Sequence, residues 1–161
     1  MFISVDQFVK EWTHESEGTL KYLKALTDDS LDQAIEEDHF SLGELAWHIT
    51  TANKGIVSQS GLKIDVSIQD EMPATAKEIA ETYEKISSAI VEAAKTQWND
   101  ESLKEMKNCF GFDMPVFSIL RLTLNHQIHH RGQMTVLMRQ AGLAVPGIYG
   151  PSREERAQMK K

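Results

Sequence analysis

The chain has 161 residues, a formal charge of −7 at pH 7 and a pI near 5.3. Nonspecific nucleic-acid binding depends on clustered Lys and Arg side chains, so this acidic balance argues against a nucleic-acid partner. The length predicts one domain, residues 1–161 with a polar C-terminal tail at 152–161, which buries about two thirds of the surface of its unfolded chain.

A single cysteine, Cys109, excludes an internal disulfide and the cysteine-rich zinc modules. It precedes Phe110 in an apolar turn where nothing indicates a depressed thiol pKa, so we expect it to be inert. Residues 1–6 lack a basic stretch followed by an apolar run, and the chain has no run of about 18 apolar residues. The sequence therefore predicts a cytoplasmic protein with no membrane partner.

The first predicted helix begins at a capping pattern, Ser4 followed by Gln7. Apolar residues then recur at helical spacing as far as about Leu26. Polar residues occupy the middle of this helix, at 14–19. This patch faces either a metal cavity or the solvent, and the sequence leaves both interpretations open.

Ser41 and Glu44 form a capping box that starts a second helix, whose apolar period fades through 55–61. No helical period is present in 62–73, although 63–68 alternates apolar and polar residues like a short strand. The sequence offers this segment no second strand to pair with. We therefore predict a long extended crossover after the second helix.

Thr75 and Glu78 give a third capping pattern, and apolar residues at steps of three and four predict a third helix that ends near Trp98. The segment 109–115 contains an internal glycine and ends in proline. It is predicted to form a turn or a short hairpin.

The fourth predicted helix runs from about Pro115 to Gln140, with Gly142 as a left-handed cap. Gly132 lies inside it at a cost of about 1 kcal/mol relative to alanine, so we expect a close helix contact there. Residues 145–152 are turn-rich yet apolar, which predicts a loop packed back on the helices. Residues 153–161 are polar and are expected to fray.

Four amphipathic segments without paired strands predict an all-α fold, a four-helix bundle with a long crossover between helices two and three. The crossover is long enough to reach the far end of the bundle. Helices two and three are therefore free to run parallel, unlike those of a simple up-down-up-down bundle.

Three histidines give the strongest chemical signal. His126 and His130 are four residues apart, so in a helix they project from one face and can bind one metal ion. His48, on the second predicted helix, supplies a third imidazole. Three neutral imidazoles with one open position are the ligands of a catalytic rather than a structural zinc site. Zinc or nickel is favoured, and iron, copper and manganese are also compatible with these ligands.

The chain resembles the DinB family, also described as DinB/YfiT-like metalloenzymes. The resemblance covers nearly the whole chain and rests on three motifs, LAWHI at 45–49, HQIHHRGQ at 126–133 and VPGIYGPS at 145–152. It implies a four-helix bundle of unusual connectivity, often a homodimer, with a divalent metal held by His48, His126 and His130. Many relatives carry an acidic residue at the position of Gln127, which implies different groups around the metal here.

Characterised members of that family include thiol-dependent S-transferases and a maleylpyruvate isomerase that use low-molecular-weight thiols such as bacillithiol or mycothiol. The family name refers to the damage-inducible expression of some members. The resemblance thus implies a metal-dependent transferase or hydrolase acting on a small-molecule substrate, without assigning a catalytic residue. The alternative is a non-catalytic dimeric stress-response or binding module with a structural metal.

Five other residues in or beside the last histidine motif are candidates for the surroundings of the metal: Asn125, Gln127, His129, Arg131 and Gln133. Asn125 and Gln133 either orient the ligating rings or make ordinary interhelical hydrogen bonds. Arg131 either neutralises a substrate carboxylate or forms a surface ion pair. His129 is expected to rim the cavity or lie on the helix surface rather than bind the metal.

Overall fold

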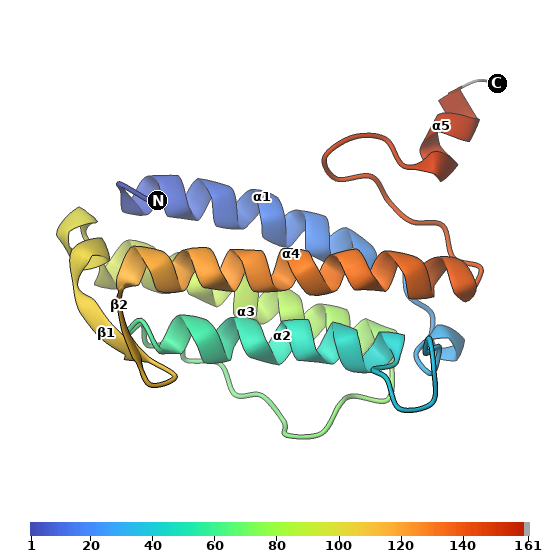
Figure 1. Ribbon diagram of the computed structural model, residues 1–161, viewed down its shortest axis with the longest axis horizontal. Helices are drawn as coiled ribbons and strands as arrows, with labels where there is room; N and C mark the ends of the chain where they lie inside the picture. Colours follow the sequence, from blue (N-terminus) through green and yellow to red (C-terminus); the bar gives the residue numbers. More distant parts are fainter. Residues whose placement is uncertain (160–161) are drawn as a thin grey trace.

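Four long helices lie side by side in the computed structural model, which describes residues 1–159 (Figure 1). They are α1 (Val5–Lys24), α2 (Leu42–Ser58), α3 (Ala76–Gln97) and α4 (Val116–Gln140). The described chain also contains a short helix α5 (Arg153–Met159), strands β1 (Met106–Cys109) and β2 (Phe112–Pro115), and the 3-10 turns η1 (Asp28–Ser30) and η2 (Asp100–Lys104). The fold is therefore mostly helical with a small two-stranded sheet. No helix within residues 1–159 is long and apolar enough to cross a membrane.

Side-chain caps begin three of the long helices where the sequence predicts them. Ser4 and Thr75 accept hydrogen bonds from backbone amides in the first turns of α1 and α3. At α2, Ser41 Oγ accepts from the amide of Glu44 at 3.2 Å, and the Glu44 carboxylate accepts from the amide of Ser41 at 2.7 Å. At the end of α4, Gly142 takes the predicted left-handed conformation with φ of +76°. These local signals fix the helix ends.

The crossover between α2 and α3 is extended, as predicted. Burial alternates along 62–68, and the inward side chains pack against the core: Leu62, Ile64, Val66 and Ile68. The crossover returns the chain to the end at which α2 began, so α2 and α3 run in the same direction and α1 and α4 run in the opposite one (Figure 1). The helices therefore do not alternate in direction along the chain.

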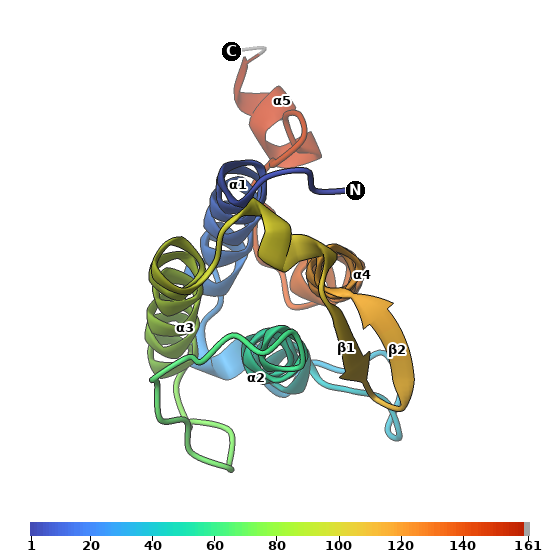
Figure 2. The ribbon, with the colours of Figure 1, turned by 90° about the vertical axis from the view of Figure 1, so that its left-hand side faces the viewer.

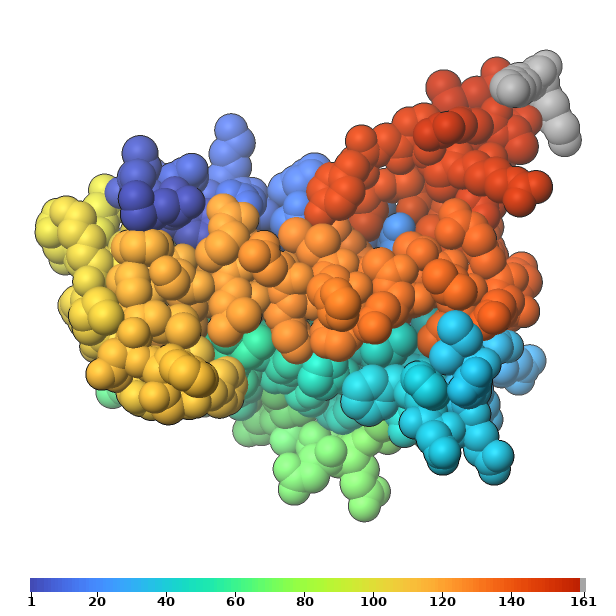
Figure 3. Space-filling view, viewed as in Figure 1, coloured from blue at the N-terminus to red at the C-terminus, as the bar shows by residue number. Residues whose placement is uncertain are grey.

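The predicted turn or hairpin is a hairpin, with β1 antiparallel to β2. Its two-residue turn consists of Phe110 and Gly111, whose φ angles are +52° and +91°. Positive φ at both positions matches the twist of the two strands. The hairpin and the loop 31–41 project on the same side of α2 and α4 (Figure 2), and α2 is visible between them below α4 (Figure 3). They border the two ends of the α2–α4 seam.

Two expectations about the C-terminal part are wrong. The predicted close contact at Gly132 is absent within residues 1–159, since a Cβ atom built there would meet no atom within 4 Å. The tail does not simply fray: residues 153–159 form α5, and Arg139 Nε donates to Glu154 Oε1 at 3.0 Å. Residues 160 and 161 lie outside the described part of the chain.

Candidate metal centre

Three histidines meet in the α2–α4 seam. His48 lies on α2, and His126 and His130 lie one turn apart on α4. The nitrogen atoms that they offer all lie within 4.8 Å of one another, and Nε2 of His48 is 3.2 Å from Nε2 of His126. Among residues 1–159, this trio is the group of His, Cys, Asp and Glu side chains that is close enough together to hold a metal ion. The structure thus brings together the three residues that the sequence singled out.

Burial keeps two histidines of the trio, His48 and His126, in the protonation state that a metal requires. Burial is the largest influence on His126, followed by repulsion from His130, His48 and His129, and together they lower the pKa of His126 to about 4. Burial, then the charge of His130, also lowers the pKa of His48. Both imidazoles are therefore neutral at pH 7 and have a lone pair to donate.

The separations suit a divalent ion. Two nitrogens bound to one tetrahedral zinc at about 2.05 Å lie about 3.3 Å apart. The His48–His126 pair already has this separation, at 3.2 Å. His130 Nδ1 lies 2.7 Å from Gln133 Oε1, which can only accept, so the proton is on Nδ1 and the Nε2 lone pair faces away from Gln133. The three histidines could therefore hold a divalent metal ion.

A pocket of about 490 Å³ opens beside His48. Besides His48, its lining consists of Phe40, Glu44, Trp47, Thr51 and the crossover residues 68–70. The Phe40 ring stacks on the His48 imidazole, with ring centroids 5.7 Å apart and planes inclined by 21°, although the Phe40 side chain is 54% exposed. The His48 side of the trio is therefore bordered by a partly aromatic pocket that is open to solvent.

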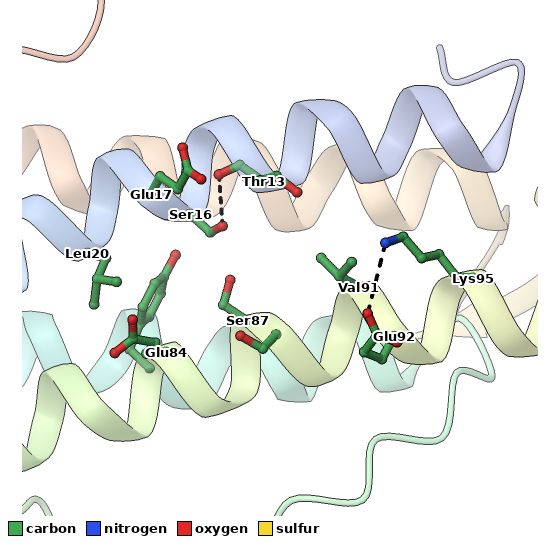
Figure 4. A pocket seen from close by; sticks show the side chains of 11 residues that line it. Thr13, Ser16, Glu17, Leu20, Glu84, Ser87, Val91, Glu92 and Lys95 are labelled. Carbon is green, nitrogen blue, oxygen red and sulfur yellow. Dashed lines mark hydrogen bonds and ion pairs between the residues drawn. The ribbon is translucent and has the colours of Figure 1, made fainter.

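A second cavity, a groove of about 420 Å³, lies between α1 and α3 and has no residue of the trio in its lining (Figure 4). Hydroxyl and carboxylate groups line it, among them Thr13, Ser16, Ser87 and Glu84. None of its lining residues is a histidine or a cysteine. The α2–α4 seam, rather than this groove, is the candidate centre.

The predicted neighbours of the trio have different environments. Gln133 contacts His130, as an orienting residue would. Asn125 and His129 are exposed, and the His129 ring lies 4.9 Å from that of His130 on the outside of the trio. Gln127 is fully buried, and its Oε1 accepts hydrogen bonds from other helices.

Arg131 is neither a surface residue nor a free cation. Its Nη2 donates to Glu15 Oε2 at 2.7 Å and to Tyr149 Oη at 2.6 Å, and its Nη1 donates to Thr19 Oγ1 at 3.0 Å. The side chains of Arg131 and Glu15 are 3% and 8% exposed. The expected surface ion pair is therefore a buried one, and Arg131 is occupied by the protein itself.

The polar patch at 14–19 is partly exposed, as one interpretation predicted, but its buried residues pack against Arg131 and not against the histidine trio. His14 and Glu17 face solvent, whereas Glu15 and Thr19 are buried against Arg131. Sequence reasoning missed the roles of Glu15 and Thr19. Their spacing of four residues, in line with the apolar stripe of this helix, is the signal that could have identified an inward polar pair.

Comparison with known proteins relates this chain to one family and to two curated proteins of Bacillus subtilis. The sequence matches the DinB family over residues 1–161. The uncharacterized protein YrdA of Bacillus subtilis (strain 168) is 48% identical over 158 residues, which are 98% of this chain and 95% of YrdA. The uncharacterized protein YjoA of the same strain is 23% identical over 140 residues, 85% of this chain and 90% of YjoA.

Solved structures show the same similarity. The crystal structure of a DinB-like protein from Bacillus cereus ATCC 10987 has a TM-score of 0.89 at 47% identity, over 92% of this chain and 100% of that one. The crystal structure of YjoA shares the fold, with a TM-score of 0.70 at 21% identity over 91% of this chain and 99% of YjoA. With a family match along its full length and three histidines placed together in one seam, the chain belongs to the DinB family.

Proposed function

We propose that this protein is a metal-dependent enzyme, a transferase or hydrolase, whose divalent ion is held by His48, His126 and His130. The convergence of three imidazole groups beside an open pocket carries the proposal. Structural zinc sites are usually closed by four protein ligands, whereas three ligands leave a position for a substrate. Zinc or nickel is the proposed ion, with iron, copper and manganese as the ions to compare.

In the preferred form the enzyme is an S-transferase that uses a low-molecular-weight thiol. A divalent ion at three histidines supplies a Lewis acid that lowers the pKa of a thiol or of water towards neutrality. The thiol sulfur forms a bond to an electrophilic carbon while the bond from that carbon to its leaving group breaks. The leaving group keeps the electron pair, and the thiol proton passes to solvent. In the hydrolase form, water replaces the thiol.

The residues of this chain have separate roles in that reaction. Gln133 holds the His130 ring through Nδ1, at 2.7 Å. Phe40 and Trp47 provide apolar surface beside His48 against which an electrophile can pack. No side chain of the trio acts as the nucleophile, because the thiol or water supplies it.

Metal analysis of protein purified without an affinity tag tests the site. We expect about one equivalent of a transition metal in the wild-type protein and less than about a tenth in His48→Ala and His126→Ala. His129→Ala is the matched control, because His129 is exposed and lies outside the trio. Less than about a tenth of an equivalent of metal per chain in the wild-type protein would contradict the proposed site.

The reaction is tested by metal-dependent conjugation of a model electrophile. Bacillithiol is the co-substrate, with glutathione and water as controls. We expect turnover that disappears on chelation and returns when zinc or nickel is added. Equal rates with and without the protein would dispose of the transferase form, and turnover with water alone would favour the hydrolase.

The alternative function is a non-catalytic module in which the ion only links α2 to α4. The supporting observation is that the trio joins these two helices directly, with 3.2 Å between His48 and His126. This alternative predicts that chelation lowers the melting temperature while no small molecule competes for the metal. Displacement of a metal-bound dye by thiols would contradict it.

We also propose that two copies pair through the outer face of α4. Exposed residues there follow one another at steps of three and four, as in a helix–helix seam: Leu122, Asn125, His129, Gly132 and Val136. Leu122 and Val136 are 39% and 49% exposed, and the space above Gly132 is open within the described chain. The sequence of α4 contains no Asp or Glu, so two copies with a charge of −7 can meet there without carboxylates facing each other.

Light scattering during size-exclusion chromatography tests this pairing. We expect a dimer for the wild type and a monomer for Val136→Glu, because the substitution places two carboxylates near each other. Ser88→Glu, at an exposed position of α3, is the matched control and should remain dimeric. A monomeric wild type would end the proposal.

A further inference from the structure

One buried amide on α4 contacts each of the other three long helices. Gln127 Oε1 accepts hydrogen bonds from Tyr83 Oη on α3 at 2.7 Å and from Asn53 Nδ2 on α2 at 3.1 Å. Thr19 Oγ1 on α1, whose hydroxyl donates to the Glu15 carbonyl at 3.1 Å, lies 3.4 Å from the same oxygen. Gln127, Asn53 and Thr19 are 0% exposed and Tyr83 is 1% exposed. The direction of the Gln127 side chain is therefore fixed from three sides.

Gln127 directly follows His126 on α4. Consecutive residues of an α-helix project about 100° apart, so a helix that keeps Gln127 in the core has only one direction for His126. His130 follows one turn later on the same face as His126. Fixing Gln127 thus orients both histidines of α4 towards the seam with α2.

The same amide also positions α2. Asn53 and His48 lie on α2, and they contact Gln127 and His126 on α4. The Asn53–Gln127 bond of 3.1 Å lies in the core, and the His48–His126 distance of 3.2 Å lies at the partly exposed seam. Two independent contacts therefore set how α2 lies against α4, and rotation of either helix would disturb both.

Two polar atoms of this arrangement, Asn53 Oδ1 and Gln127 Nε2, are buried without a hydrogen-bond partner among the protein atoms of residues 1–159. Buried polar atoms without partners lower the free energy of unfolding, and apolar side chains of similar shape would avoid that loss. A polar centre kept at this cost is expected to serve a purpose other than stability.

We propose that Gln127 is the positioning residue of the histidine trio, and that its bonds to Asn53 and Tyr83 hold His126 and His130 opposite His48. The proposal rests on the proposed function, in which the trio binds a divalent ion. Gln127 does not touch the ion. It acts by fixing the rotation of α4. Its removal therefore lowers the metal affinity by more than the accompanying loss of stability explains.

Zinc affinity, measured by competition with a chromophoric chelator, tests the proposal together with the visible spectrum of the cobalt(II)-loaded protein. Gln127→Met keeps the length of the side chain and removes its hydrogen bonds. We expect it to lower zinc affinity about 10- to 100-fold and to change the cobalt spectrum. Asn53→Leu, which removes the bond from the α2 side, is a second variant with the same expected direction.

Two further variants separate positioning from stability. Gln127→Glu retains an acceptor oxygen and should bind zinc within about threefold of the wild type. Leu124→Ala creates a cavity at a fully buried position of α4 whose side chain has no polar atom and so makes no hydrogen bond in this network. It should lower the melting temperature by roughly 5–15 °C and leave the cobalt spectrum unchanged. Wild-type affinity in Gln127→Met, or an equal loss of affinity in Leu124→Ala, would overturn the proposal.

A wild-type protein that binds no zinc would contradict the proposed function but not, by itself, the role of Gln127. Crystal structures of the metal-free wild type and of Gln127→Met then test whether Gln127 positions the histidines. We expect the His48–His126 Nε2 separation, 3.2 Å here, to exceed about 4 Å in the variant. An unchanged separation would overturn the positioning role.

Discussion

The hydroxyl group of Tyr149 donates a hydrogen bond to Glu15 Oε2 at 2.7 Å, although 134 residues separate the two in the chain. Arg131 Nη2 donates hydrogen bonds to Glu15 Oε2 and to the Tyr149 hydroxyl oxygen. Tyr149 is 67% exposed, yet its hydroxyl reaches a buried ion pair. The loop after α4 is therefore attached to α1 and α4 by charge-assisted hydrogen bonds.

Removing parts of this attachment should lower stability by different amounts. Tyr149→Phe removes one hydrogen bond and should lower the free energy of unfolding by about 1–2 kcal/mol. Glu15→Ala leaves Arg131 buried without its partner and should cost about 3–5 kcal/mol. Urea denaturation measures both, with Glu17→Ala, at an exposed neighbouring position, as the control. Similar effects of Glu15→Ala and Glu17→Ala would contradict the buried ion pair.

The metal-free protein should lose stability in mild acid. The pKa of His126 is about 4 in the folded state, below the value near 6.5 for an unfolded histidine, so the unfolded state binds more protons between these values. The stabilising contribution of neutral His126 is complete above about pH 6.5 and is lost as the pH falls towards about 4. Melting temperatures across this range should fall less steeply in His126→Asn. Parallel curves for the two proteins would show that His126 titrates normally.

Two glycine-to-alanine substitutions should act in opposite directions. A Cβ atom at Gly147 would collide with the carbonyl oxygen of Gly150 and the carboxylate of Glu155, so Gly147→Ala should lower stability by about 1–3 kcal/mol. Gly55 lies inside α2 with open space around its Cα, so Gly55→Ala should raise stability by about 0.5–1 kcal/mol. Thermal denaturation compares the pair. A stabilising Gly147→Ala would mean that the loop repacks freely.

Cys109 should be unreactive in the folded protein. Its side chain is 1% exposed, and burial raises the pKa of its thiol, which disfavours the reactive thiolate. A disulfide reagent should label about one thiol per chain in denaturant and almost none under native conditions within minutes. Cys109→Ala should keep its metal. Rapid labelling of the native protein would show that the β1–β2 hairpin opens readily.

Local patterns in the sequence were sufficient to predict the four long helices and to pair His126 with His130, but not to predict α5. A capping side chain such as Ser41 bonds to an amide only three residues away, so the start of α2 depends on a few neighbouring residues. The spacing of His126 and His130 places them on one face wherever that helix lies. Their partner His48 was found from its helix and from the family motifs, and the structure placed it beside them.

The buried polar contacts depended on the tertiary structure. Gln127 contacts side chains 44, 74 and 108 residues away, and Arg131 contacts Glu15 at a distance of 116 residues. The sequence could not distinguish a surface arginine from a buried one, because burial depends on how α1 and α4 rotate against each other. The open space above Gly132 was likewise set by which helices approach α4. Helical periodicity identifies the face on which a residue lies, but only the packing of the helices decides what that face meets.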